Sequence, residues 1–181
     1  MDEIDMAGGA PVTVRELLPE DEKGVARLFA ACGDYFTAAT GSAALPADVQ
    51  SLYYALPEGA EFDQKRLLVV CRGGGVVGLV DLVDRYPDAE SCSVGLFVVA
   101  PEARGEGVGS AVAGRLIEEG AGRGTRKVAA ACPGGWEPGL GFLRGLGFAV
   151  GEPEELTGET LGNRTRQPAE TGLRRAWLNL G

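Results

Sequence analysis

The stretch 100-APEARGEGVGS-110 decides the fold of this chain, because a strand-like run precedes it and a helix-like run follows it. Residues 93–100, SVGLFVVA, are apolar and rich in β-branched and aromatic side chains, which is typical of a buried strand. Residues 108–119 carry apolar side chains four positions apart, which predicts an amphipathic helix. The glycines at 105, 107 and 109 lack a Cβ atom and leave room for another molecule. A strand, a glycine turn and a helix start form an anion site, because unpaired N–H groups and the helix dipole converge there.

The composition is that of one globular domain. A length of 181 residues is enough to bury a core, and 45% hydrophobic with 24% charged residues is ordinary. Continuous apolar runs fall short of the roughly 18 residues that a membrane helix needs. Residues 1–10 are acidic and lack the features of a signal peptide. We therefore expect a disordered tail over 1–10, a single domain over 11–181, a cytoplasmic location and no membrane partner.

Charge and missing residue types exclude several functions. The formal net charge is −9, which argues against a nucleic-acid partner and favours cationic small molecules. The chain has no histidine, so Ser-His-Asp and Cys-His catalysis and most zinc sites are excluded. Its four cysteines, at 32, 71, 92 and 132, lack zinc-knuckle spacing. We expect buried, reduced thiols and no metal.

The remaining patterns predict a mixed sheet with helices. Residues 12–17, 126–132 and the segment 173–180 read as strands, and residues 65–72 and 75–86 read as a hairpin around three glycines. Residues 19–32, 47–55 and 139–148 read as helices, the last one weakened by its glycines. Residues 152–171 show no apolar periodicity. This order of elements indicates an α/β class with a mixed sheet, and it differs from a doubly wound nucleotide fold.

The order and the residues together resemble the GNAT superfamily of acetyl-CoA-dependent N-acetyltransferases. That family's cofactor signature, Arg/Gln-x-x-Gly-x-Gly/Ala, is matched by Arg104, Gly107 and Gly109, and the similarity extends from Val12 to Leu180. The segment 80-VDLVDRYPDAESCSVGLFVVAPEARGEGVG-109 also resembles a bacterial subgroup with a Tyr-Pro-Asp loop. The resemblance implies a central, mostly antiparallel, twisted sheet of about six to seven strands with flanking helices. It further implies that the fourth and fifth strands splay apart.

Other glycine motifs fit less well. A dinucleotide-binding Gly-x-Gly-x-x-Gly would need a glycine at 110, where Ser110 stands, and its ribose-binding acid about 20 residues on is missing. A P-loop needs Gly-Lys-Ser/Thr, which does not occur. A tight turn that needs glycines for its backbone alone remains an alternative.

The resemblance implies a set of acetyl-CoA contacts. Backbone N–H groups of the glycine turn would hold the pyrophosphate, with Arg104 helping to hold phosphate charge. The main chain of the preceding strand would pair with the pantetheine arm and stabilise the thioester oxygen. The expected cofactor-binding residues are Phe97, Val99, Arg104, Gly105, Glu106, Gly107, Val108, Gly109 and Ser110.

Catalysis needs positioning of the reactants and a proton acceptor. Glu90, with Asp88 beside it, lies near where some family members carry a glutamate base, and Asp81 is a second candidate. Many members carry a tyrosine that protonates the departing thiolate, and alignment on Gly147 and Phe148 puts Leu143 there. Another donor, such as Cys132 or Tyr86, could serve, or the thiolate could leave without help.

The resemblance also implies where the acceptor binds. In this family the acceptor pocket is formed by the first two helices, the side of the third and fourth strands and the loop before the last strand. This assigns Tyr35, Phe36, Tyr54 and Tyr86, with Tyr53 and the polar segment 157–171 as further candidates. Ordinary helix packing is the alternative for the paired tyrosines.

Two functions follow from these residues. The first is an N-acetyltransferase that moves an acetyl group from acetyl-CoA to a primary amine of a small molecule. The second is a non-catalytic acyl-CoA-binding domain, which Leu143 keeps open. The resemblance leaves a homodimer open as well.

Overall fold

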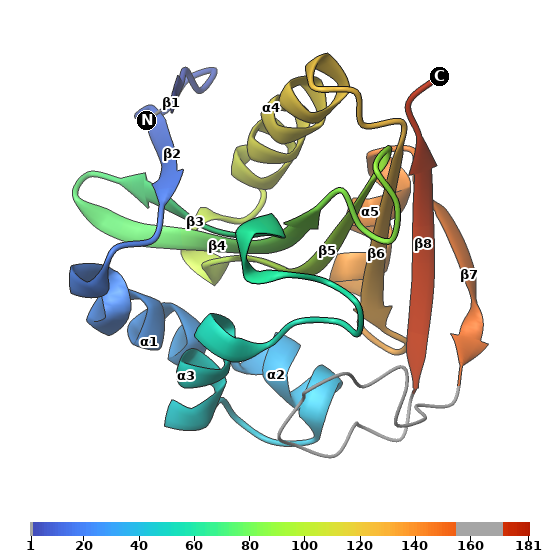
Figure 1. Cartoon of the computed structure of the whole chain (residues 1–181). Helices are drawn as coiled ribbons and strands as arrows, with labels where there is room; N and C mark the ends of the chain where they lie inside the picture. Colours follow the sequence, from blue (N-terminus) through green and yellow to red (C-terminus); the bar gives the residue numbers. More distant parts are fainter. Residues whose placement is uncertain (1, 155–171) are drawn as a thin grey trace.

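A computed structural model describes residues 2–154 and 172–181 of the chain. Its centre is a single sheet with strand order β1-β2-β3-β4-β5-β6-β8-β7, antiparallel throughout except for the parallel pair β5 and β6. Helices α1 to α3 lie on one side of the sheet and α4 on the other (Figure 1). The predicted α/β class and mostly antiparallel mixed sheet are confirmed. The strands are β1 (Asp2–Ile4), β2 (Val12–Glu16), β3 (Lys65–Arg72), β4 (Gly75–Asp84), β5 (Ser91–Val99), β6 (Lys127–Pro133), β7 (Ala149–Glu154) and β8 (Leu173–Asn179).

The helices agree with most of the sequence patterns. The expected helix over 19–32 is a short 3-10 turn, Pro19–Asp21, followed by α1, and the glycine turn leads into the longest helix. The helices are α1 (Glu22–Ala31), α2 (Gly33–Thr40), α3 (Pro46–Tyr54), α4 (Val108–Gly122) and α5 (Glu137–Gly145). None of the helices in the described ranges is long and apolar enough to cross a bilayer.

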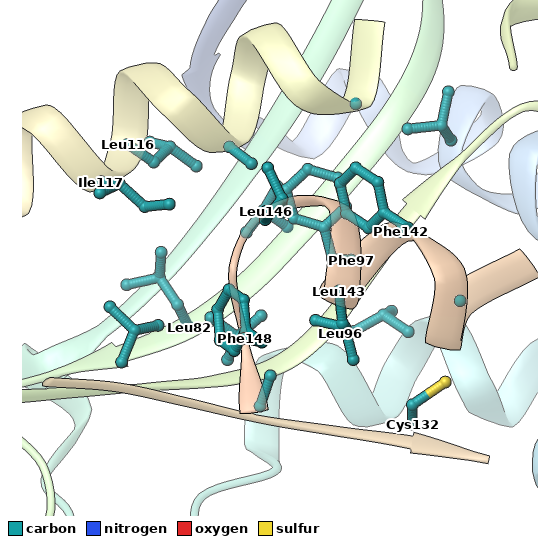
Figure 2. Close-up of a pocket in the computed structure, with 18 of the residues that line it drawn as sticks. Leu82, Leu96, Phe97, Leu116, Ile117, Cys132, Phe142, Leu143, Leu146 and Phe148 are labelled. Carbon is teal, nitrogen blue, oxygen red and sulfur yellow. The ribbon is translucent and has the colours of Figure 1, made fainter. Parts of the chain in front are cut away.

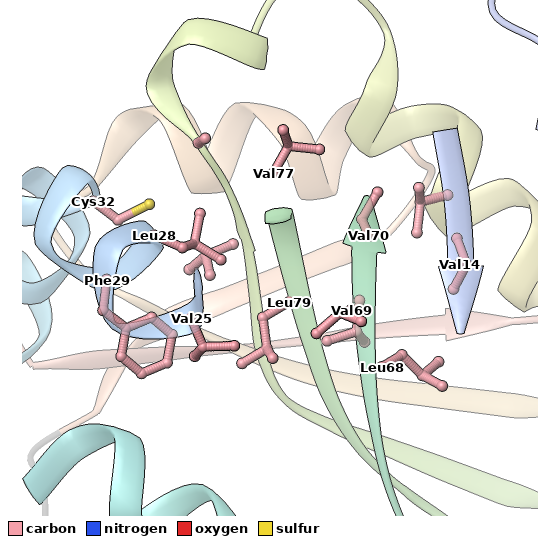
Figure 3. Packing of buried hydrophobic residues seen from close by; sticks show 14 of the residues in the cluster. Val14, Val25, Leu28, Phe29, Cys32, Leu68, Val69, Val70, Val77 and Leu79 are labelled. Carbon is pink, nitrogen blue, oxygen red and sulfur yellow. The ribbon is translucent and has the colours of Figure 1, made fainter. Parts of the chain in front are cut away.

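Burial of the apolar face of α1 against the sheet forms the main core. Val25, Leu28 and Phe29 are nearly inaccessible to solvent and face Leu79 and its neighbours on β3 and β4 (Figure 3). Burying side chains of this size contributes about 1.5–3 kcal/mol each. A smaller cluster around Val128, Phe148 and Ala176 joins β6, β8 and α5. The main cluster includes Cys92 and Val98 of β5, whereas the smaller one includes Val128 of β6.

The splay between β5 and β6 is the feature that positions the site. The two strands pair in parallel from Ser91/Lys127 to Val94/Ala130 and then separate, although β5 continues to Val99 and β6 to Pro133. A bulge accompanies the separation, because Asp81 pairs with Leu96 and Leu82 with Val94, which leaves Gly95 without a partner on β4. A bulge bends its strand and increases local twist, so it turns the end of β5 away from β6. The splay was predicted between the fourth and fifth strands counted from residues 12–17, and these two strands are β5 and β6 once β1 is included.

Two expectations need correction. Residues 2–4, placed in a disordered tail, form the edge strand β1, with Asp2 opposite Val14 and Ile4 opposite Val12. Ile4 and Met6 pack against the core, and this burial holds a segment that looked too polar to fold. Within the described residues the sheet therefore has eight strands rather than six or seven. Residues 33–40 form α2, which the sequence left unassigned, and Gly41 ends it in a left-handed conformation at φ 81°. Most of the aperiodic segment 152–171 lies outside the described residues.

Candidate cofactor site and active site

The glycine turn presents free backbone donors at the start of α4. Gly105 and Gly107 adopt left-handed φ values of 77° and 84°, which β-carbon-bearing residues rarely adopt. The first backbone hydrogen bond of the helix runs from Ala111 N to Gly107 O, so the N–H groups of Val108, Gly109 and Ser110 have no acceptor within α4. A Cβ at Gly105 would meet no atom within 4 Å. The turn is thus an open cradle suited to an anion.

Gly109 has a different reason to be glycine. A Cβ there would lie 3.1 Å from Cε2 of Phe142 and 3.7 Å from Cγ2 of Val99. Its missing side chain therefore lets α5 pack against the start of α4. Gly109 therefore has a packing reason to be glycine in addition to the predicted role of leaving room for a ligand, and it lines the cavity with Gly105 and Gly107.

The Arg104 guanidinium is already engaged by the protein. Its Nε donates to the Val99 carbonyl at 2.9 Å, and Nη1 and Nη2 lie 2.6 and 3.2 Å from the carboxylate of Asp34. The pair is partly exposed, with 29% of the Arg104 side chain and 43% of the Asp34 side chain accessible. The guanidinium beside it holds the pKa of Asp34 below its usual value. Arg104 therefore ties α2 to the end of β5, and the turn's own amides are left to face an anion.

Trp136 completes this cluster. Its Nε1 donates to Asp34 at 3.3 Å, its ring lies 5.8 Å from the Arg104 guanidinium carbon, and Tyr35 contacts it edge-on at 5.2 Å. A Cβ on Gly139 would lie only 2.4 Å from the indole, so only glycine lets the ring sit there. Asp34 was not identified from the sequence, because no local pattern marks a carboxylate whose partner lies 70 residues away.

The main chain of β5 faces the splay at Phe97 and Val99. The N–H of Ala100 donates to Val77 on β4 at 2.8 Å, and Val99 lies opposite Gly78. Backbone groups in an antiparallel pair point alternately toward and away from the partner strand. Those of Phe97 and Val99 therefore point away from β4, into the gap that β6 leaves. This is the edge that the family resemblance assigns to the pantetheine arm.

A cavity of about 440 Å³ begins at the glycine turn and runs between β5, β6, α4 and α5. Figure 2 shows Phe97 and Phe142 in the middle of the lining, with Leu116 and Ile117 on one side of them and Cys132 on the other. The two rings lie 5.4 Å apart. Sites for small ligands in proteins fall in this volume range and have this apolar character. The lining includes the expected residues Phe97, Val99, Arg104, Gly105, Gly107, Val108, Gly109, Ser110 and Tyr35.

Glu106 stands apart from the other expected cofactor residues. Its carboxylate forms an ion pair with Arg72 at the end of β3, and it is absent from the cavity lining. Two arginines thus flank the glycine turn, and each has a carboxylate partner.

Asp81 is a buried carboxylate next to the bulge in β5. Lys65 donates to both of its oxygens at 2.8 and 2.9 Å, and the same ammonium donates to the Ala55 carbonyl at 2.8 Å. Burial raises the pKa of Asp81, and the ammonium partly offsets the rise. A Cβ added to Gly95 would lie 3.9 Å from Oδ2 of Asp81, and Gly95 lines the cavity. Asp81 itself is not among the lining residues, so Gly95 separates its carboxylate, whose pKa is raised, from the cavity.

Several expected site residues lie elsewhere. Glu90 is exposed and directly precedes β5, at the end of the strand opposite to the glycine turn. Its carbonyl accepts hydrogen bonds from the amides of Arg126 and Lys127, which fixes this position beside the start of β6. Phe36 is 5% exposed and packs on Phe29 in the core. Tyr54 projects into solvent from α3. The Tyr86 hydroxyl donates to the Glu58 carbonyl at 2.9 Å, and Tyr86 is outside the cavity lining.

The position of the family's tyrosine acid is apolar. Leu143 lines the cavity and joins the smaller hydrophobic cluster. Cys132 also lines the cavity, and burial raises the pKa of its thiol to about 11. Across residues 2–154 and 172–181 no cluster of acidic or thiol side chains could hold a metal ion.

Comparison with known proteins places this geometry in a family. Two solved structures share the fold. An acetyltransferase from Thermus thermophilus is 20% identical with a TM-score of 0.68, and the match covers 93% of this chain and 97% of that one. The GNAT domain of S. lividans PAT is 18% identical with a TM-score of 0.68, and the match covers 99% of this chain and 96% of that one. A third is the ribosomal-protein-S18-alanine N-acetyltransferase from Escherichia coli (14%, 0.62, 94% and 94%). No curated protein matches the sequence closely enough to count as a relative. The acetyltransferase (GNAT) family model matches residues 27–148, and the chain therefore belongs to the GNAT acetyltransferase family.

Proposed function

We propose that the protein is an N-acetyltransferase that acetylates a primary amine of a small molecule with acetyl-CoA. The observation that carries the proposal is the opening between β5 and β6, with the anion cradle of α4 at its mouth. Phosphate groups fit the free amides of Val108, Gly109 and Ser110. An extended pantetheine arm fits the edge at Phe97 and Val99 as an added strand, where the Val99 N–H faces the gap and the Val99 carbonyl already accepts from Arg104.

Each residue has a role in the transfer. Acetyl-CoA supplies an activated thioester, so that a C–N bond to the amine forms as the C–S bond breaks. Main-chain N–H groups at Phe97 and Val99 stabilise the developing oxyanion. Asp81 lies behind Gly95, outside the cavity lining, and accepts the amine proton through a bridging water, while Lys65 orients its carboxylate. The buried thiol of Cys132, which lines the same cavity as Leu143, is the proton donor that we assign to the departing sulfur.

A small cationic acceptor is favoured by charge. The net charge of −9 attracts amines, and Tyr35 and Trp136 line the cavity with aromatic rings that suit an ammonium group. The similar E. coli structure is named for an alanine of a ribosomal protein. A panel of amines tested as acceptors must therefore include a peptide with N-terminal alanine.

The cofactor site is tested by a matched pair of substitutions. Gly107 and Gly59 share a φ of 84°, so leucine at either position brings the same backbone strain. Only Gly107 lines the cavity. Calorimetry with acetyl-CoA should show binding lost in Gly107→Leu and retained in Gly59→Leu. Equal affinities in the two folded variants would place the cofactor elsewhere.

The second candidate is a non-catalytic acyl-CoA-binding module, which the apolar Leu143 keeps open because it offers no proton to the departing thiolate. Thiol release from acetyl-CoA across the amine panel separates the two. Release with at least one amine supports the enzyme. Tight acetyl-CoA binding without release by any amine supports the module.

A further inference from the structure

The cavity continues beyond the splay into a second compartment. Past the last pair between β5 and β6, Val94 with Ala130, it lies between the paired strands and the inner face of α4. We call this compartment the inner chamber. Its walls are Leu82, Val94, Leu116, Ile117, Val128, Leu146 and Phe148. Figure 2 shows Leu116 and Ile117 of α4 on one side of it and Leu82 and Phe148 on the other.

The lining of the inner chamber is hydrocarbon up to its far end. Arg66, Asp84 and Arg123 close it there, with Asp84 Oδ2 3.8 Å from Arg66 Nη1 and 3.6 Å from Arg123 Nη2. These ion pairs mark the point where an apolar guest must end. An apolar chamber has no polar partners for water, so it stays dry and gains free energy when an apolar group fills it.

Small side chains create the space. Ala113 on α4 and Ala130 on β6 line the cavity where larger residues would fill it. Protein interiors are close-packed, with few voids larger than a water molecule. An empty compartment of this kind next to a ligand site is therefore better explained as a binding site for an apolar ligand group than as loose packing.

The inner chamber begins where the acyl group would sit. Phe97, whose main chain faces the splay, pairs with Phe142 at the boundary between the glycine-turn side and the inner chamber. From Phe97 to Cys92, the last lining residue of β5, five residues of strand span roughly 16 Å. A pantetheine arm that follows β5 from Val99 to Phe97 points its thioester toward this space.

We propose that the inner chamber holds the hydrocarbon tail of an acyl donor longer than acetyl, in the butyryl to hexanoyl range. This rests on the proposed function, because the same cradle and strand edge hold the CoA part. The transfer is unchanged: the C–N bond to the amine forms, the C–S bond breaks, and the CoA sulfur takes the proton. What differs is that each further methylene leaves water for the walls of Leu116, Ile117 and Phe148.

The test is a series of CoA, acetyl-CoA, butyryl-CoA and hexanoyl-CoA, with Kd measured by calorimetry on the full chain. Each buried methylene should lower Kd about fourfold, up to hexanoyl. A Kd that is the same for acetyl-CoA and hexanoyl-CoA, or weaker for hexanoyl-CoA, overturns the proposal while leaving the proposed function standing. A chain that binds none of the four compounds refutes both.

A matched pair of variants locates the effect. Ile117→Trp fills the inner chamber from α4, whereas Glu118→Trp adds the same side chain at the next, exposed position. The ratio of the hexanoyl-CoA and acetyl-CoA affinities should fall at least tenfold in Ile117→Trp and stay at the parent value in Glu118→Trp. An unchanged ratio in a folded Ile117→Trp protein would show that the tail lies elsewhere.

Discussion

The Asp34–Arg104 pair gives the sharpest test of the site geometry. Asp34→Asn removes the carboxylate that accepts from Nη1 and Nη2 of Arg104 and from Nε1 of Trp136. The asparagine keeps the shape of the side chain and loses its charge. Arg104 then retains the Val99 carbonyl, 2.9 Å from its Nε, as an acceptor.

The expected loss of stability is about 1 kcal/mol. Exposed ion pairs contribute 0.2–1 kcal/mol, and the two-pronged geometry with an indole donor puts this pair at the upper end. The discount for solvent is needed because 43% of the Asp34 side chain is accessible. In a chain of 181 residues, about 1 kcal/mol lowers Tm by roughly 2–4 °C.

Thermal unfolding against pH checks the cause. The pKa of Asp34 is lowered in the folded protein, from 3.8, so its contribution is fully present above 3.8 and is lost as pH falls through the folded value. Parent and Asp34→Asn should therefore differ in Tm at pH 7 and converge in strong acid. In a Trp177→Phe background, Trp136 is the single indole. Its fluorescence should therefore report the protonation of Asp34 as the pH falls.

Calorimetry adds a functional readout. An Arg104 side chain released from Asp34 carries an unpaired charge beside the glycine turn, so acetyl-CoA should bind Asp34→Asn more tightly at low salt. Identical Tm values at pH 7, or a Tm difference that persists below the folded pKa of Asp34, would refute the reasoning. Arg104→Lys is the companion variant, because it keeps the charge and loses the two-pronged contact.

Three further outcomes are expected. Asp81→Asn should lower kcat by about 10²–10⁴-fold while acetyl-CoA still binds. The acid limb of the parent pH–rate profile should lie above the usual aspartate range, because burial raises the pKa of Asp81. An acid limb at the ordinary aspartate value would count against Asp81 as the base. Leu143→Tyr should raise kcat, since it restores a hydroxyl that can protonate the thiolate; unchanged or slower turnover in the folded variant would point to Cys132 or to rate-limiting attack by the amine. Asp21→Asn should lower the free energy of unfolding by about 2 kcal/mol in urea titration, because Asp21 is buried and accepts two Arg15 hydrogen bonds and one from the Leu18 amide; a loss under about 0.5 kcal/mol would contradict this.

Local patterns in the sequence predicted most of the elements correctly. The hairpin around Gly73 and Gly74 forms because both glycines take positive φ, and the helix at Val108 starts where the apolar period begins. Two elements escaped because their stability is not local. β1 is three residues long and depends on pairing with β2, and α2 depends on burial of Phe36 against α1.

The candidate site also contains features that local sequence predicts and features that depend on tertiary structure. The cradle at Gly105 and Gly107 was predictable, since a left-handed turn before a helix leaves a signature within a few residues. Glu90 and Asp81 looked alike in sequence, yet one is exposed at the far end of β5 and the other is buried beside Lys65. Only the register of β3 and β4 decides which carboxylate gains a buried partner.

The sequence by itself determined the fold class, the position of the glycine turn and the apolar faces of the main helices, because φ preferences and apolar periods act over a few residues. Tertiary structure alone decided that Arg104 binds Asp34, that Gly109 makes room for Phe142 and that β5 parts from β6 after Val94. These features join segments between 33 and 70 residues apart, as the Gly109–Phe142 and Arg104–Asp34 pairs show. Contacts of that range arise only when strand order and helix packing bring the segments together, and no local pattern in the chain encodes them.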